Sequence, residues 1–204
     1  TSNCILIKNR KTGETLNELY GKRILIAVGG KPKRPNVDGS SLCWTSDDMF
    51  LLKKFPDEIT IVGAGFIACE FACILQGLGV EVTQLVRGEN VLRGFDLELS
   101  SALTEAMIRK GINLRFGENV SSIKGNPGSL IIRTSKDEDF VSNGLLFATG
   151  REPFLEGLKL EKAGIEILEN KIKVDSESKT NISNIFAIGD VTDRINLTPV
   201  AIDE

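Results

Sequence analysis

The sequence has 204 residues, of which 41% are hydrophobic, a net charge of −3 and a pI near 5.3. This composition supports a folded core in one or two domains, and the acidic balance argues against a nucleic-acid-binding surface. No apolar run approaches the ~18 residues of a membrane-spanning helix, and no signal peptide opens the chain.

The chain contains no histidine and four cysteines. The lack of histidine removes the commonest general acid–base group and the commonest metal ligand. No cysteine-rich or carboxylate-rich spacing replaces it, so no metal site is predicted. Four cysteines without a pairing pattern suit a reducing compartment in which thiols stay free.

The first 30 residues have the pattern of a β-meander, with strands expected at Cys4–Lys8 and Arg23–Val28, the second of them buried. The basic, proline-punctuated segment Lys31–Pro35 is typical of a connector and is the best candidate for a domain boundary. A short helix is expected at Asp47–Leu52.

The most informative stretch begins with the β-prone residues Ile59–Val62, which lead into a Gly-x-Gly-x-x-Ala motif at Gly63, Gly65 and Ala68. A helical pattern follows directly, and residues 80–86 then alternate as a second strand. Strand, glycine turn, helix and strand form the dinucleotide-binding βαβ unit. Gly63 permits the tight turn, Gly65 lets a pyrophosphate approach the helix N-terminus, and Ala68 allows close packing. A βαβ unit that binds no phosphate is the alternative.

The helix of this unit has an apolar stripe that is expected to face the sheet, made of Ile67, Phe71, Ile74, Leu75 and Leu78, and glycines 77 and 79 end it. Its other side carries Phe66 and Glu70, which should be largely exposed, together with Cys73. Cys69 and Cys73 lie four residues apart. Their Cβ atoms would be about 5–6 Å apart, whereas a disulfide needs roughly 3.5–4.5 Å. They are interpreted as packing residues.

Further along, Asp96 should cap a helix over Leu97–Lys110 with Gly111 as its stop, and a parallel strand is expected at Ile112–Phe116. The apolar face of that helix is expected to consist of Leu99, Leu103, Ala106 and Met107. Short strands joined by polar turns follow up to residue 147 and predict an antiparallel meander behind the parallel sheet. A hairpin over residues 165–174 and a buried strand over residues 184–188 complete the chain.

The end of the second βαβ strand indicates which nicotinamide coenzyme fits. An NAD site places an acidic residue there to hold the ribose 2′-hydroxyl. Here the position is Val86, followed by Arg87 and, six residues later, by Arg93. Guanidinium groups hold a 2′-phosphate by charge-assisted hydrogen bonds, so the sequence favours NADP(H). Two solvated loop arginines are the alternative.

Five segments carry a resemblance to a known family: residues 26–32, 63–68, 87–96, 148–153 and 185–201. In this order and spacing they resemble the flavin-dependent pyridine nucleotide–disulfide oxidoreductases, and Leu92–Asp96 after the arginine resembles the glutathione-disulfide reductase branch. The resemblance implies NADPH and FAD as cofactors. It implies an α/β fold in which residues 36–148 form a Rossmann-like, NADPH-binding domain, flanked by partial FAD-domain segments at residues 1–35 and 149–204.

The resemblance also implies a role for individual residues. Arg87 and Arg93 would bind the 2′-phosphate, and Gly150 would lie along the dinucleotide. Gly189 and Asp190 match the second flavin motif, in which the aspartate holds the ribityl chain, and Thr198 would lie near the isoalloxazine. The residues that would surround the NADPH pyrophosphate and nicotinamide are Gly63, Ala64, Gly65, Phe66, Ile67, Ala68 and Glu70. Among them, Phe66 takes the place of an aromatic residue that covers the flavin, and Glu70 the place of a glutamate that pairs with a flavin-domain lysine. A strand-ending turn aspartate is the alternative for Asp190, and a helix-start packing residue is the alternative for Phe66.

Three parts of the family pattern are missing: the first FAD-binding glycine motif, the Cys-x4-Cys redox pair, and the C-terminal interface domain with its acid–base histidine. A fragment of a dimeric NADPH-dependent reductase of small-molecule disulfides is therefore expected, one that does not turn over alone. A cytoplasmic or plastid compartment suits it. Another reductase of the family is a first alternative, and a non-catalytic NADP-binding module is a second. The length of the natural reading frame would separate a module from a fragment.

Overall fold

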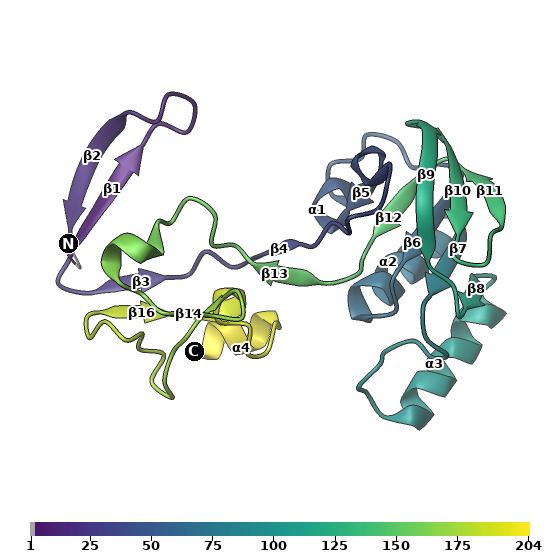
Figure 1. Cartoon of the computed structure of the whole chain (residues 1–204). Coiled ribbons are helices and arrows are strands. Elements are labelled where there is room, and N and C mark those ends of the chain that lie inside the picture. The colour runs from purple at the N-terminus through teal and green to yellow at the C-terminus, as the bar shows by residue number, and fades with distance from the viewer. Residues whose placement is uncertain (1–2) are drawn as a thin grey trace. The chain divides into compact units, whose positions relative to one another are not determined.

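The computed structural model describes residues 3–204 and divides into two compact units (Figure 1). Unit 2 is the continuous segment Pro32–Gly150, and it is inserted between the two segments of unit 1, which end at Lys31 and resume at Arg151. The assignment of these units to NADPH- and FAD-binding domains, with boundaries at residues 35 and 148, stays a prediction.

Unit 2 has a five-stranded, fully parallel sheet in the order β5-β12-β6-β7-β8. Its strands are β5 (Trp44–Thr45), β6 (Glu58–Val62), β7 (Glu81–Val86), β8 (Asn113–Phe116) and β12 (Leu145–Phe147). A three-stranded antiparallel sheet joins β9 (Val120–Asn126), β10 (Ser129–Thr134) and β11 (Asp139–Ser142). The predicted α/β class and the predicted strand–turn–helix–strand order are confirmed. The assignment of residues 145–147 to the meander is wrong, because β12 inserts beside β6 in the parallel sheet.

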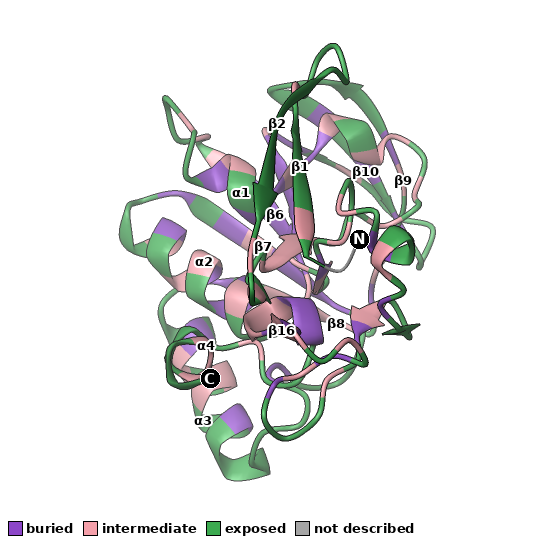
Figure 2. Cartoon of the chain, turned by 90° about the vertical axis from the view of Figure 1, so that its left-hand side faces the viewer, coloured by how far each residue is buried: buried purple, intermediate pink, exposed green. Residues whose placement is uncertain are grey.

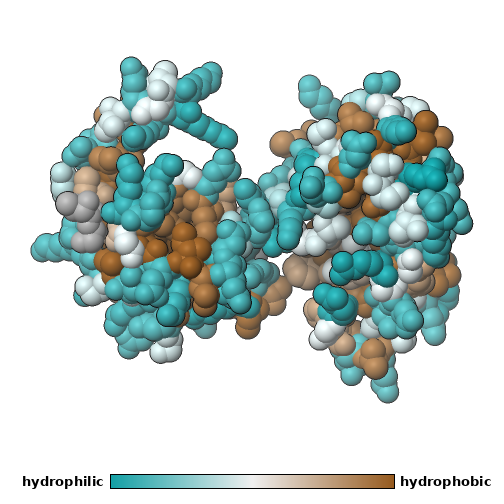
Figure 3. All heavy atoms as spheres, viewed as in Figure 1, coloured by the Kyte–Doolittle hydropathy of each residue, from teal (hydrophilic) through white to brown (hydrophobic). Residues whose placement is uncertain are grey.

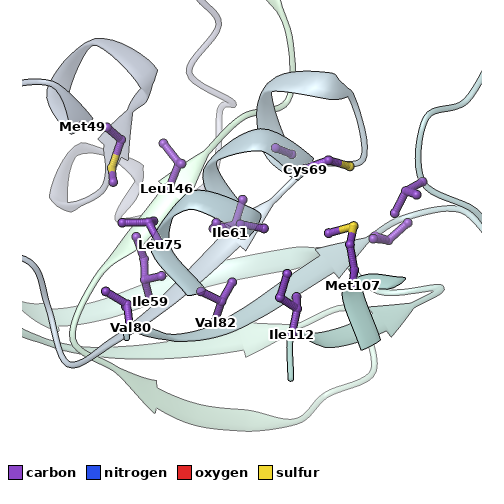
Figure 4. Close-up of a cluster of buried hydrophobic side chains, with 14 of the residues drawn as sticks. Met49, Ile59, Ile61, Cys69, Leu75, Val80, Val82, Met107, Ile112 and Leu146 are labelled. Atoms are coloured by element: carbon purple, nitrogen blue, oxygen red, sulfur yellow. The ribbon is translucent and has the colours of Figure 1, made fainter. Parts of the chain in front are cut away.

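The parallel sheet of unit 2 is buried on both faces, which explains why its strands read as nearly continuous apolar runs. One hydrophobic cluster includes Ile59, Ile61 and Val82 and lies under helix α2 (Phe66–Gly77) (Figure 4). A second cluster on the antiparallel sheet includes Leu85 and Phe147. Helix, parallel sheet and antiparallel sheet thus form three layers that fix the ends of β6 and β7 in place.

The expected apolar face of α2 is confirmed at Leu75 and wrong at Ile74 and Leu78. The residues buried against the sheet are Ala68, Cys69, Ala72 and Leu75. By contrast, Ile74 and Leu78 are 55% and 57% exposed. The small side chains of the buried face let the helix backbone approach the strands closely, so a stripe chosen by size alone selects the wrong side. Cys69 and Cys73 are free thiols, as expected.

Helix α3 (Leu97–Arg109) begins as predicted, because the Asp96 carboxylate accepts hydrogen bonds from the amides of Glu98 and Leu99 at 2.9 and 3.1 Å. Its predicted buried face is wrong at Leu99, which is exposed, whereas Ser100 is buried. The Ser100 hydroxyl donates to the Val91 carbonyl at 2.7 Å, and this bond turns the helix toward the loop before it. The other short helices of unit 2 are η1 (Ser40–Leu42) and α1 (Ser46–Met49), the latter starting and ending earlier than expected.

Unit 1 begins with the hairpin of β1 (Cys4–Lys8) and β2 (Thr15–Tyr20), and Figure 2 shows how little of it is buried. The strand predicted at Cys4–Lys8 is confirmed, but its partner β2 was not predicted, and the predicted meander is wrong at the next strand. Strand β3 (Ile24–Ile26) pairs in parallel with β16 (Ile185–Ala187). The two strands lie too far apart in the sequence for a local pattern to reveal their pairing. Leu25 of β3 is 57% exposed, against the expected buried strand.

The remaining elements of unit 1 are short: β4 (Gly30–Pro32), which pairs with β13 (Arg151–Pro153), η2 (Leu160–Ala163), β14 (Ile167–Leu168), β15 (Lys171–Ile172), η3 (Gly189–Thr192) and α4 (Thr198–Asp203). The predicted hairpin over residues 165–174 is confirmed, with both turn residues, Glu169 and Asn170, at positive φ as a two-residue hairpin loop requires. Hydrophobic residues reach the surface in both units (Figure 3). No helix among residues 3–204 is long and apolar enough to cross a membrane.

Candidate functional site

The glycine turn of unit 2 leaves β6 at Gly63, where only glycine fits. Its φ is 138°, and an added Cβ would lie 2.3 Å from the carbonyl oxygen of Ala148, the residue that follows β12. The Gly63 amide donates to the Leu85 carbonyl at 3.1 Å. Gly63 is therefore required by the packing of the turn itself and needs no ligand to explain it.

Gly65 differs from Gly63 both in its backbone conformation and in the space available for a side chain. Its backbone has φ −78°, which any residue adopts, and among residues 3–204 no atom beyond its own chain neighbours lies within 4 Å of the position of an added Cβ. Nothing in unit 2 demands glycine there, so the free space in front of Gly65 fits a ligand that approaches the backbone. Gly65 is also the N-cap of α2, whose first turn has no capping side chain and no acidic residue. The amides of this turn remain available for an anion, which the helix dipole favours.

A residue that sequence reasoning missed supports this turn from below. Gln84, in the middle of β7, is completely buried, and its Nε2 donates to the Gly63 carbonyl at 2.9 Å. It also lies 3.9 Å from the Cys69 sulfur. Burial raises the pKa of the Cys69 thiol, and the Gln84 hydrogen bond opposes that rise. An amide side chain at a position that faces the core in the alternating pattern of residues 80–86 was the available signal.

The two arginines predicted to bind a 2′-phosphate belong to the loop between β7 and α3. Val86 is buried as the last residue of β7, and Arg87 and Arg93 are exposed. Within residues 3–204, neither guanidinium group has a hydrogen-bond or ion-pair partner. Two cations without protein partners next to the strand end match the chemistry of a site for a doubly charged phosphate.

The loop is tied to the glycine turn by its backbone. The Leu92 amide donates to the Ala64 carbonyl at 2.6 Å, so Arg93 follows directly after a residue anchored to the turn. Leu92 has φ 52°, a left-handed conformation that costs a residue other than glycine about 1–2 kcal/mol. Its side chain is only 9% exposed and packs in the cluster under α2. Burying a leucine contributes about 1.5–3 kcal/mol, enough to offset the backbone strain.

Phe66 and Glu70 lie one turn apart at the start of α2, and both are exposed, as predicted. Phe66 is 38% exposed, so part of the residue is covered. Ile67 is half-buried, and Ala68 is fully buried, with its Cβ 3.4 Å from the position of a Cβ on Gly63. Contact of Phe66 and Glu70 with a flavin or a flavin domain stays a prediction.

Gly150 closes unit 2 at φ 136°, with open space around it. It follows Ala148 by two residues, and the Ala148 carbonyl is the atom that excludes a side chain at Gly63. The Ala-Thr-Gly segment therefore runs past the glycine turn, as expected for a residue that lies along a dinucleotide bound there.

In unit 1, β16 leads into Gly189 and Asp190 at the start of η3. The Asp190 carboxylate lies 3.5 Å from Nε of Arg151, whose Nη2 donates to the Gly30 carbonyl at 2.6 Å. The Gly189 amide donates to the Glu204 carboxylate at 2.7 Å. Asp190 is thus held by Arg151, a contact that the sequence did not predict. Thr198, the first residue of α4, is exposed.

Comparisons with known proteins agree with one another. A family model described as pyridine nucleotide-disulphide oxidoreductase matches residues 1–204. The chain is 46% identical over 184 residues to a glutathione reductase of Burkholderia cepacia, covering 90% of this chain and 41% of that protein. It is 42% identical to the glutathione reductase of Nostoc sp. PCC 7120, covering 98% and 46%.

A trypanothione reductase of Leishmania donovani is 40% identical over 196 residues, covering 94% of this chain and 39% of that protein. Among solved structures, the HOCl-induced flavoprotein disulfide reductase RclA of Escherichia coli, as its Cu(II) complex, superposes with a TM-score of 0.91 at 25% identity. That match covers all of this chain and 46% of the other. The chain therefore spans less than half the length of the curated relatives that it matches.

Proposed function

The chain belongs to the pyridine nucleotide-disulphide oxidoreductase family, and from this membership we propose that it is the NADPH-binding part of a flavin-dependent reductase of glutathione disulfide. Members of the family use FAD and NADPH. When bound, NADPH supplies a hydride and FAD relays its two electrons toward the disulfide. The full reductase acts as a homodimer on a small-molecule disulfide in this proposal, and the present chain does not turn over alone.

The observation that carries the proposal is the pairing of an open glycine turn with two unpartnered arginines in unit 2. The α2 amides and the space in front of Gly65 receive the pyrophosphate. Arg87 and Arg93 hold the 2′-phosphate, and the apolar Val86 leaves no carboxylate to repel it. Ala68 keeps the helix close to the sheet so that these groups converge.

The other assigned residues take supporting roles. Phe66 and Glu70, on one face of the first turns of α2, cover the flavin and meet its domain. Gly150 lies along the dinucleotide. In unit 1 the Asp190 carboxylate, oriented by Arg151, accepts from the ribityl hydroxyls of FAD, with Gly189 and Thr198 beside it. Only the second flavin motif of the family, at Gly189 and Asp190, is in the chain, so FAD binding by this chain alone is weak.

Calorimetric titration of the 204-residue chain with NADPH and with NADH tests the proposal. NADPH binds more tightly, and Arg87→Met and Arg93→Met each weaken NADPH binding by about 1.5–3 kcal/mol, the range for hydrogen bonds to charged groups. Neither change alters NADH affinity. Arg109→Met is the matched control, because Arg109 is an exposed arginine of α3 that pairs with Glu105. Equal affinity for the two coenzymes in the unmodified chain would refute the proposal.

A further inference from the structure

The loop between β7 and α3, which carries Arg87 and Arg93 and is called the arginine loop below, contains one strained residue, Leu92. Leu92 combines a left-handed backbone, a nearly buried side chain and a short amide bond to the Ala64 carbonyl of the glycine turn. Non-glycine residues in this conformation persist only where the surroundings hold them, and such positions cluster at functional sites.

Both sides of Leu92 are fixed. Before it, Val91 is fully buried, and its carbonyl accepts from the Ser100 hydroxyl. After it, the Leu92 carbonyl accepts from the Phe95 amide at 3.0 Å across a turn that contains Gly94 at φ 94°. The left-handed residue reverses the chain at the edge of the core, so Arg93 is exposed although its predecessor is buried. The position of Arg93 therefore depends on the conformation of Leu92.

We propose that Leu92 is a positioning residue for coenzyme discrimination: its left-handed backbone, anchored to Ala64, sets the distance between the pyrophosphate turn and the Arg93 guanidinium. This inference rests on the proposed function, since it assumes that NADPH binds at both places. The span between them is fixed by the coenzyme's own structure. A rigid link through one hydrogen bond places Arg93 before the ligand arrives, which reduces the entropy lost on binding.

A matched pair of substitutions isolates the backbone conformation from side-chain volume. Leu92→Ile and Leu92→Met both keep an apolar side chain of similar size. Isoleucine is β-branched and strongly disfavours the left-handed region, whereas methionine is unbranched at Cβ and tolerates it about as leucine does. The two variants therefore differ chiefly in whether the residue keeps φ near +50°.

Calorimetry with NADPH and NADH on the two variants gives the readout. Leu92→Ile should weaken NADPH binding roughly tenfold, the equivalent of one lost charge-assisted hydrogen bond. NADH affinity should change less than about twofold, because NADH has no 2′-phosphate for Arg93 to bind and effects at independent sites add to within about that factor. Leu92→Met should bind both coenzymes as the unmodified chain does. Circular dichroism and a urea melt confirm that each variant is folded under the titration conditions.

Two results overturn the inference while leaving the proposed function intact: a Leu92→Ile variant that keeps its NADPH preference, or one that loses affinity for both coenzymes equally. The first means that Arg93 is placed without Leu92, and the second that Leu92 supports only the glycine turn. The proposed function fails separately, when the unmodified chain shows no preference for NADPH. If Leu92→Ile does not fold, Leu92→Gly provides the test, because glycine keeps the left-handed backbone and the amide that bonds to Ala64 while it removes the side chain. Leu92→Gly should then retain the NADPH preference, and a folded Leu92→Gly variant without that preference would overturn the inference.

Discussion

The two glycines of the turn after β6 should separate stability from binding. Gly63→Ala places a side chain at φ 138°, which costs about 1–3 kcal/mol outside glycine. Its Cβ would also lie 2.3 Å from the Ala148 carbonyl oxygen, and the resulting backbone shift costs typically about 1–3 kcal/mol more. The sum, about 2–6 kcal/mol, is a large part of the roughly 5–15 kcal/mol that stabilise a domain.

Gly65→Ala is the matched variant. The backbone of Gly65 is ordinary and the space for a Cβ is empty, so the free energy of unfolding should fall only because alanine is a poorer N-cap than glycine. That loss is about 1 kcal/mol or less. The added methyl group does, however, occupy the space in front of the turn. We expect Gly65→Ala to unfold almost as the unmodified chain does, but to bind NADPH and NADH at least tenfold more weakly, because both carry the pyrophosphate.

Trp44 makes the measurement specific to unit 2. It is the chain's only tryptophan, it belongs to β5, and its ring packs against Gly144. Its fluorescence during urea denaturation should show the midpoint of Gly63→Ala lowered by roughly 1–3 M, given a slope of about 2 kcal/mol per molar urea. A Gly63→Ala variant as stable as the unmodified chain would refute the steric argument. Unchanged coenzyme binding by Gly65→Ala would show that no ligand approaches the turn.

Further predictions concern single side chains. Asp96→Ala should cost about 1 kcal/mol, because two amides of α3 lose their acceptor, and the same urea melt measures it. Phe66→Ala should cost well below the roughly 3–5 kcal/mol of a buried phenylalanine, since the ring is 38% exposed, and should slow flavin reduction by NADPH in a full-length reductase, as stopped-flow absorbance would show. The purified chain should lack a stoichiometric flavin absorbance band; such a band would contradict the assignment of only half a flavin site. Burial raises the pKa of Cys43 from 9.0 to about 11. The folded state therefore retains the proton, so iodoacetamide should label Cys43 slowly at pH 8, and the stability of unit 2 should fall as the pH rises from 9 through 11.

The βαβ unit was predictable because its signals are local. Gly63 and Gly65 stand between a β-prone run and a helical pattern. Asp96 caps its helix by accepting from amides no more than three residues away, so this signal is local as well. The same local reasoning placed the wrong face of α2 against the sheet. Hydrophobicity favoured Ile74 and Leu78, but close packing on a sheet selects small residues such as Ala72, and sequence spacing does not reveal how near two elements come.

What the sequence could not reveal depended on contacts across long separations. The pairing of β3 with β16 and the Arg151–Asp190 contact join residues far apart in the chain. The left-handed Leu92 was hidden for another reason. Leucine is a poor marker of positive φ, and only the buried environment and the bond to Ala64 make this conformation stable. Candidate ligand residues could thus be named from motifs, while the residues that orient them could not.

The insertion of unit 2 into unit 1 has a consequence for the order of folding. The ends of unit 2 lie together, because the Lys33 amide donates to the Gly150 carbonyl at 2.9 Å and the Thr149 hydroxyl to the Lys33 carbonyl at 3.4 Å. Before unit 2 folds, joining β3 to β16 must close a flexible loop of more than a hundred residues. Once unit 2 has folded, only 39 flexible residues remain between the two strands (158 less the 119 of unit 2), and loop-closure entropy then favours the pairing by roughly 1 kcal/mol relative to the unfolded connection. In a nascent chain unit 2 is complete before β16 is synthesised, so we expect the parallel pair of unit 1 to form more readily when unit 2 has folded first.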